Sequence, residues 1–193
     1  MKVMIIVIKD YEKPQEENAV KIFFEGVGAE VVIKTIEFSS PDKITNALLS
    51  ESNSVDYMIG VGLAGFFVLS EINSNSRIVI NPWMSPSQKI SQKRTISNDL
   101  LRTLKKIETK TYDCVDAELR VVTYGIFTHD AGTCDKEMFL KTYGRNMNGV
   151  DNYSFMKENL CSELENTLKY FEYIASLNSW NYMPGPLLGL IDL

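Results

Sequence analysis

The amino-acid sequence predicts a three-layer α/β/α sandwich with a mostly parallel sheet, and three observations carry this prediction. Segments with strand-like and helix-like patterns alternate along the chain, which is typical of a parallel sheet covered by helices. Residues 3–8 form a continuous apolar run, as expected of a strand that is buried on both faces. Residues 156–177 repeat apolar side chains every three or four positions, which predicts a long amphipathic helix.

The remaining elements follow from the same patterns in chain order. Pro41 follows two serines, and a serine cap with a proline in the first turn is a usual helix start. Helices are expected over 14–27, 41–49, 66–72, 137–143 and 156–177. Strands are expected over 3–8, 31–38, 55–59, 77–81 and 119–127.

Length, composition and charge limit the classes of function. A chain of 193 residues that is 45% hydrophobic predicts one α/β domain spanning 1–193. A net charge of −5 argues against a nucleic-acid partner and favours a small neutral or amphiphilic ligand. Three cysteines without C-x-x-C spacing predict neither a disulfide framework nor a zinc site, and they favour a cytoplasmic location. The uncharged apolar stretch 57–69 is shorter than the roughly 20 residues of a membrane span.

Two segments depart from the regular alternation. Residues 83–116 contain a basic stretch, which predicts an excursion over one face of the domain. Its cations either recognise an anionic group or form an ordinary solvated helix face. Residues 179–193 form an apolar tail that is broken by Pro184, Gly185 and Pro186. This tail is expected to pack back onto the domain or onto the partner subunit of a homo-oligomer.

The turn over 60–65 satisfies two motifs with different chemistry. As G-x-G-x-x-G it matches a dinucleotide-binding fingerprint, but that motif belongs to the first strand–helix turn of its domain. The fingerprint also needs an acidic residue about 20 positions later, where this chain has Asn81. As G-x-S-x-G the turn is a nucleophile elbow in which Gly62 replaces the serine and Ala64 occupies the last small position. A third interpretation is that the glycines only allow a helix to pack closely on a strand.

Residues 56–87, in which Ile80-Asn81-Pro82 closes the strand after the elbow helix, resemble the small bacterial YqiA/YcfP-type esterase-like proteins. The similarity is greatest to a branch whose elbow also carries glycine. It implies an α/β-hydrolase type of fold, with Asp130 at the position of the triad acid. Tyr153 stands at the position of the triad histidine, which makes it the vacated base position.

The resemblance also implies that part of the oxyanion loop is replaced. Proteins of this superfamily usually carry His-Gly after the first strand, whereas residues 9–11 read Lys-Asp-Tyr here. The remaining features of an oxyanion site are Gly62 and Leu63, where a helix begins at the end of a strand. A serine hydrolase needs a nucleophile, a base and oxyanion donors together, and the sequence supplies neither the expected serine nor the expected histidine.

Three functions remain open from the sequence, and whether the chain is an enzyme is undecided. The leading hypothesis is a catalytically degenerate hydrolase that binds a small ligand in the crevice over Gly62 and Leu63. The alternative is an unorthodox esterase that uses His129 and Asp130, although these residues also fit a loop histidine and a helix cap. The third is a nucleotide-binding protein that uses the glycine turn. No cofactor and no metal site are expected.

Overall fold

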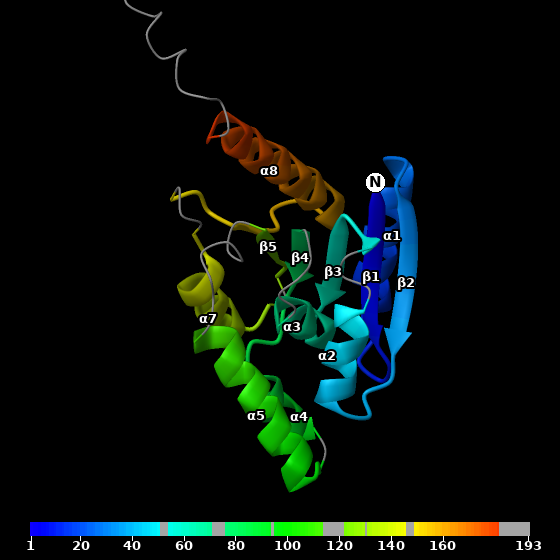
Figure 1. Ribbon diagram of the computed structural model, residues 1–193, viewed down its shortest axis with the longest axis vertical. Coiled ribbons are helices and arrows are strands. Elements are labelled where there is room, and N and C mark those ends of the chain that lie inside the picture. Colours follow the sequence, from blue (N-terminus) through cyan, green and yellow to red (C-terminus); the bar gives the residue numbers. More distant parts are fainter. Residues whose placement is uncertain are drawn as a thin grey trace, which may run out of the picture.

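The structure is a computed structural model that describes residues 1–50, 54–70, 76–93, 95–113, 122–129, 131–145 and 149–181. Its centre is a sheet with the strand order β2-β1-β3-β4-β5-β6, in which every strand is parallel to its neighbours (Figure 1). The strands are β1 (Lys2–Ile8), β2 (Glu30–Ile36), β3 (Tyr57–Val61), β4 (Ser76–Ile80), β5 (Thr123–Phe127) and β6 (Tyr153–Phe155). The predicted sheet is confirmed, and in the described residues it is entirely parallel.

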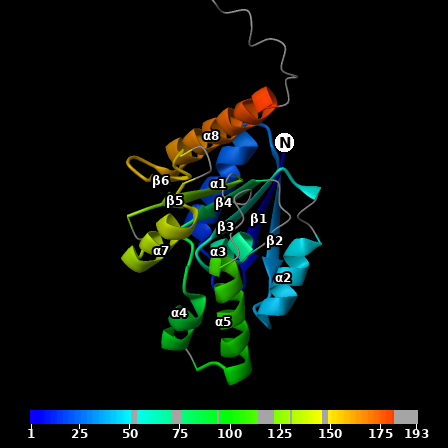
Figure 2. The same cartoon turned by 60° about the vertical axis from the view of Figure 1, so that its left-hand side comes forward.

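Helices cover both faces of the sheet, as a three-layer sandwich requires (Figure 2). One face is covered by α1 (Pro14–Gly26) and α8 (Leu160–Asn181), which pack against each other. The other face carries α2 (Pro41–Leu49), α3 (Leu63–Ser70), α4 (Pro86–Lys93), α5 (Asn98–Asp113) and α7 (Thr133–Tyr143). The chain therefore crosses from one layer of helices to the other between β1 and β3.

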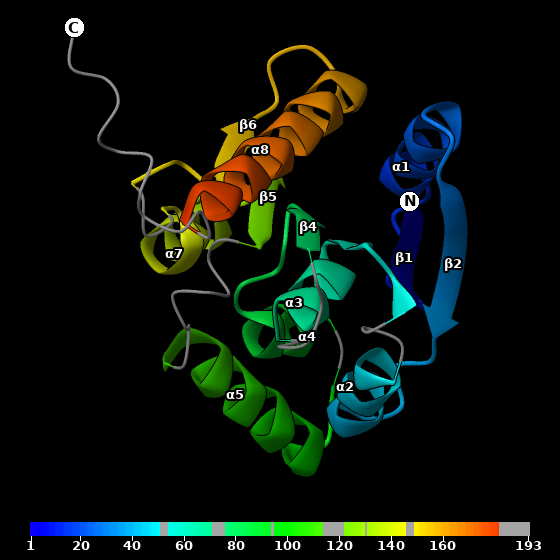
Figure 3. The same cartoon turned by 45° about the horizontal axis from the view of Figure 1, so that its top comes forward.

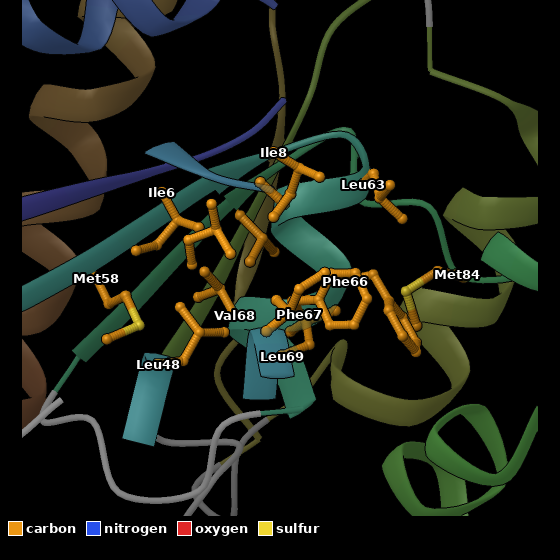
Figure 4. Packing of buried hydrophobic residues seen from close by; sticks show 14 of the residues in the cluster. Ile6, Ile8, Leu48, Met58, Leu63, Phe66, Phe67, Val68, Leu69 and Met84 are labelled. Atoms are coloured by element: carbon orange, nitrogen blue, oxygen red, sulfur yellow. The ribbon is translucent and has the colours of Figure 1, made fainter. Parts of the chain in front are cut away.

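The apolar run of β1 serves both layers at once. Side chains along a strand alternate between its faces, so Val3, Ile5 and Val7 belong to the core under α1 and α8. Ile6 and Ile8 belong to the opposite core together with α3, whose residues are nearly all buried (Figure 4). Strand β1 is thus buried on both sides, which explains why its sequence shows no polar alternation.

The observed elements differ from the sequence expectations at several ends. The long helix begins at Leu160 rather than at 156, because the Asn159 side chain accepts a hydrogen bond from the Ser162 amide and caps the first turn. The short strand β6 was not predicted, since three residues become a strand only by pairing with β5. The first three residues of the strand expected over 119–127 and most of the tail expected over 179–193 lie outside the described residues.

Within residues 83–116, where the sequence predicts an excursion, the described helices are α4 and α5. Both helices extend beyond the carboxyl ends of the strands (Figure 1). In the part of the chain that the structure describes, no helix is long and apolar enough to cross a membrane.

Candidate functional site

The candidate site lies where the chain changes from one layer of helices to the other. Strands β1 and β3 are neighbours, and the helices that follow β1 and β2 cover opposite faces of the sheet. In parallel α/β sheets, such a switch point leaves a crevice at the carboxyl ends of the strands, where ligands usually bind. Gly62 follows β3 directly at this crevice.

Gly62 forms the turn between β3 and α3 by itself. Its φ of +59° lies in the left-handed region that favours glycine. Its amide donates a hydrogen bond of 2.9 Å to the Ile80 carbonyl, and its own carbonyl accepts one of 3.0 Å from the Trp83 amide. The turn is therefore one residue long rather than the six expected from the sequence, and it is fixed to the end of β4.

The other two glycines of the motif serve close packing. A Cβ on Gly60 would lie 2.6 Å from the backbone of Ala64, and a Cβ on Gly65 would lie 3.0 Å from the Gly60 carbonyl oxygen. Helix α3 therefore packs so closely on β3 that a larger residue at position 60 would force the backbone apart, and one at position 65 would need its neighbours to move by a few tenths of an ångström. The packing interpretation holds for Gly60 and Gly65, whereas at Gly62 the backbone conformation is what requires glycine.

A small cleft of about 110 Å³ opens beside Gly62. Its walls come from the start of α1, the end of β3, the segment after β4, helix α4 and the start of α7. It is lined by Lys13, Glu16, Val61, Gly62, Asn81, Trp83, Lys89, Gly132 and Asp135. These described lining residues include four charged side chains but no serine, threonine, cysteine, tyrosine or histidine.

A buried carboxylate holds the wall of the cleft in place. Asp135 of α7 is 5% exposed and accepts a hydrogen bond of 2.8 Å from the Met84 amide. Its second oxygen forms an ion pair with Lys89 of α4. Asp135 thus joins α7 to α4 and to the segment after β4. Sequence reasoning missed this residue because its partners lie 46 and 51 positions away and no motif connects them.

Trp83 forms the aromatic wall. Its Nε1 lies 3.5 Å from the point that a Cβ on Gly62 would occupy, so the indole N–H borders the space above the turn. Tyr11 packs edge-on against its ring at 5.8 Å between centroids, and the Lys93 Nζ lies 4.7 Å from the ring centre. Such a cation over the indole face is attracted by the ring's electron density. The ring is therefore held from two sides.

The residues that the sequence singled out are only partly brought together. Gly62 and Leu63 lie at the crevice, with Leu63 buried as the first residue of α3. His129 is exposed and does not line the cleft, and Asp130 lies outside the described residues. Tyr153 lies on β6, where it borders two other surface hollows and not the cleft beside Gly62.

Ser87, another potential nucleophile, is occupied structurally. Its hydroxyl and its amide both donate to the carboxylate of Glu108 on α5, at 2.9 and 2.7 Å. Burial raises the pKa of Glu108, although these two hydrogen bonds oppose the shift. This carboxylate therefore ties α5 to the start of α4, next to the cleft rather than in it.

The geometry offers little to a nucleotide or a metal ion. The Gly62 amide is already bonded to Ile80, and Asn81 is engaged with Thr128 through bonds of 2.6 and 2.9 Å that connect the ends of β4 and β5. The Gly62 amide is therefore not available to a phosphate, and a neutral amide at position 81 replaces the carboxylate that binds a ribose in the dinucleotide fold. Among the described residues, no group of three His, Cys, Asp or Glu side chains could hold a metal ion.

No known protein family matches the chain, and no curated protein matches it. Among solved structures, the esterase domain of a Rhodothermus marinus protein is similar, with a TM-score of 0.50 and 11% identity over 93% of this chain and 84% of that one. At this identity the similarity shows the fold alone, a three-layer α/β/α sandwich with a parallel sheet. A LacI family transcriptional regulator, CcpA from Weissella paramesenteroides with bound glucose, shares 11% identity over 95% of this chain and 93% of that one, with a TM-score of 0.32.

Proposed function

We propose that this protein is a non-hydrolysing protein of the α/β-hydrolase type that binds one small polar ligand in the cleft over Gly62. The observation that carries the proposal is that several segments bring charged and polar side chains to this cleft without any nucleophile among the described lining residues. Ester hydrolysis through an acyl-enzyme needs a hydroxyl or thiol with a base in reach. The lining is suited to holding a molecule rather than to attacking one.

The size of the cleft limits the ligand. A water molecule occupies about 30 Å³ in the liquid, so a cleft of about 110 Å³ has room for roughly four water molecules, or for one compact molecule of about four to six bonded non-hydrogen atoms. Pockets for drug-sized ligands and cofactors are several times larger. The ligand class is therefore narrower than the neutral or amphiphilic molecules expected from the composition, because a long apolar chain would find no room.

The lining determines the polarity of the ligand. Lys13 and the Trp83 indole offer hydrogen-bond donors, and Glu16 offers an acceptor. The ion pair between Lys89 and Asp135 connects two walls, so the cleft is formed before the ligand arrives. A small molecule with both oxygen acceptors and a hydroxyl or amino donor would use these groups best.

No described contact favours the two other functions. An esterase based on His129 would need that side chain at the cleft, where it does not lie. A nucleotide would need free backbone donors at the glycine turn, where the Gly62 amide is already bonded. A cytoplasmic location stays a prediction from the composition.

The proposal is tested by calorimetric titration of the protein with acetate, phosphate, glycine and glycerol. At least one of them should bind saturably, and Lys13→Met or Asp135→Asn should weaken that binding about fivefold or more, because the first removes a donor of the cleft and the second removes the ion pair that connects two of its walls. Lys21→Met, two turns along α1, is the matched control and should bind as the parent does. The proposal fails if none of the four binds, or if p-nitrophenyl acetate is hydrolysed above a heat-denatured control.

A further inference from the structure

We propose that the exposed side of α5 is a docking surface for a short acidic segment of a partner protein. This surface, called the basic face below, is formed by Arg102, Lys105, Lys106 and Lys110. The inference goes beyond the proposed ligand cleft, because none of these residues lines that cleft.

The basic face is a stripe along one side of the helix. Residues three, four and eight positions apart lie on the same side of an α-helix, which is how these four cations are spaced. All four side chains are exposed and border a surface hollow of about 760 Å³, together with Asn98, Leu101 and Thr109. No acidic residue is among the described residues that line this hollow. Figure 3 shows α5 at the edge of the molecule, far from α8.

The cations of the basic face have no ion-pair partner within the part of the chain that the structure describes. Helix α5 contains three acids, Asp99, Glu108 and Asp113, and the structure describes the side chains of the first two. Glu108 is turned inward to Ser87, and Asp99 is exposed in the first turn without lining the hollow. Arg102 and Lys106, like Lys106 and Lys110, are four positions apart, a spacing at which like charges destabilise a helix. A bound anionic group would relieve this repulsion.

Charge is unevenly distributed along the chain, and this favours a short acidic segment over a broad anionic surface. Residues 86–113 contain seven Lys and Arg against three Asp and Glu, although the whole chain has a net charge of −5. A membrane or a nucleic-acid duplex presents negative charge over a broad area and would also meet the acidic remainder of the protein. A short acidic peptide contacts the basic face alone, so its attraction is not offset by repulsion elsewhere.

The length of the stripe sets the length of the segment. From Asn98 to Lys110 the helix rises by roughly 18 Å, at 1.5 Å per residue. An extended peptide covers this distance with about six residues. The hollow beside the helix gives room for the peptide's side chains, and the half-buried Leu101 offers a limited apolar contact between the cations.

Fluorescence anisotropy of a fluorescein-labelled octaglutamate peptide, titrated with the full chain at low salt, tests the proposal. Lys105→Glu/Lys106→Glu should weaken binding at least about tenfold, and Lys105→Gln/Lys106→Gln should weaken it less. The matched control is Lys43→Glu/Lys141→Glu, which changes the net charge equally at two exposed lysines elsewhere and should alter binding less than about twofold. Melting temperatures confirm that each variant is folded, and binding should weaken as salt is raised.

Three results would overturn the proposal. One is the absence of saturable binding of octaglutamate by the parent protein. Another is an equal loss of binding in the Lys105/Lys106 and Lys43/Lys141 variants, which would indicate general charge attraction. The third is tighter binding, dependent on Lys105 and Lys106, to phosphatidylserine vesicles or to duplex DNA, which would assign the basic face to a lipid surface or a nucleic acid.

Discussion

The substitution Gly62→Ser tests both the backbone and the chemistry of the candidate site. A Cβ at this position would meet Trp83 Nε1 at 3.5 Å and Lys13 carbons at 3.8 and 3.9 Å, which are ordinary contact distances. The steric term is therefore small. The φ of +59° is what opposes serine, and a non-glycine residue in the left-handed region costs about 1–2 kcal/mol. For a chain of this size, that loss lowers the melting temperature by roughly 2–8 °C.

Gly28 provides a control for the conformational term. Its φ is +81° and a Cβ there would meet nothing within 4 Å, so Gly28→Ser introduces the same kind of strain on an open surface. Both variants should lose similar stability in thermal and urea unfolding. Unchanged stability of Gly62→Ser beside a clear loss in Gly28→Ser would refute the assignment of strain to the turn.

The same variant should stay inactive toward p-nitrophenyl acetate. A new hydroxyl at Gly62 would find no histidine among the described lining residues of the cleft, and the members of a catalytic triad act as a unit. Robust esterase activity of Gly62→Ser would show that a base does reach this point. It would overturn the view that the cleft lacks a catalytic base.

Three further outcomes follow from the structure. Gly60→Ala should destabilise the protein by about 3 kcal/mol or more in urea unfolding, since the new Cβ would lie 2.6 Å from the Ala64 backbone; a loss below that of Gly62→Ser would contradict this. Burial raises the pKa of Glu108 in the folded state above its value in the unfolded chain. The free energy of unfolding therefore falls as pH rises above the unfolded pKa, because the unfolded chain then ionises more readily than the folded one. The melting temperature of Glu108→Gln, relative to that of the parent, should therefore increase between pH 4 and pH 7. A relative melting temperature that decreases over this range would contradict the raised pKa. His129→Ala should leave the affinity of the cleft for its ligand unchanged in calorimetric titration. A loss of binding would show that His129 contributes to the ligand site.

The fold could be predicted largely because its signals are local. The apolar run of β1 and the serine-capped, proline-started helix α2 are both written in neighbouring residues, and α2 spans the predicted 41–49. Strand β6 has only three residues and is defined by its pairing with β5, so no pattern within it distinguishes it from a loop.

The candidate site was predictable only in part, for the same reason. Gly62 was recognised because its motif is contiguous in the sequence. Trp83, Lys89 and Asp135 come together through tertiary contacts between α4, α7 and the segment after β4, and their spacing in the chain carries no signal. An interaction that depends on how helices pack becomes visible only in three dimensions.

Ligand binding in the cleft can be followed at the Trp83 indole N–H in a titration monitored by nuclear magnetic resonance. The chain has two tryptophans, so Trp180→Phe leaves one indole signal. If the cleft binds a small polar ligand, acetate, phosphate, glycine or glycerol should move this signal and the Gly62 amide signal saturably, while short esters remain intact in the same samples. If the signals do not move with any of the four ligands, or if the esters are consumed, the cleft is not a non-hydrolysing site for a small polar ligand.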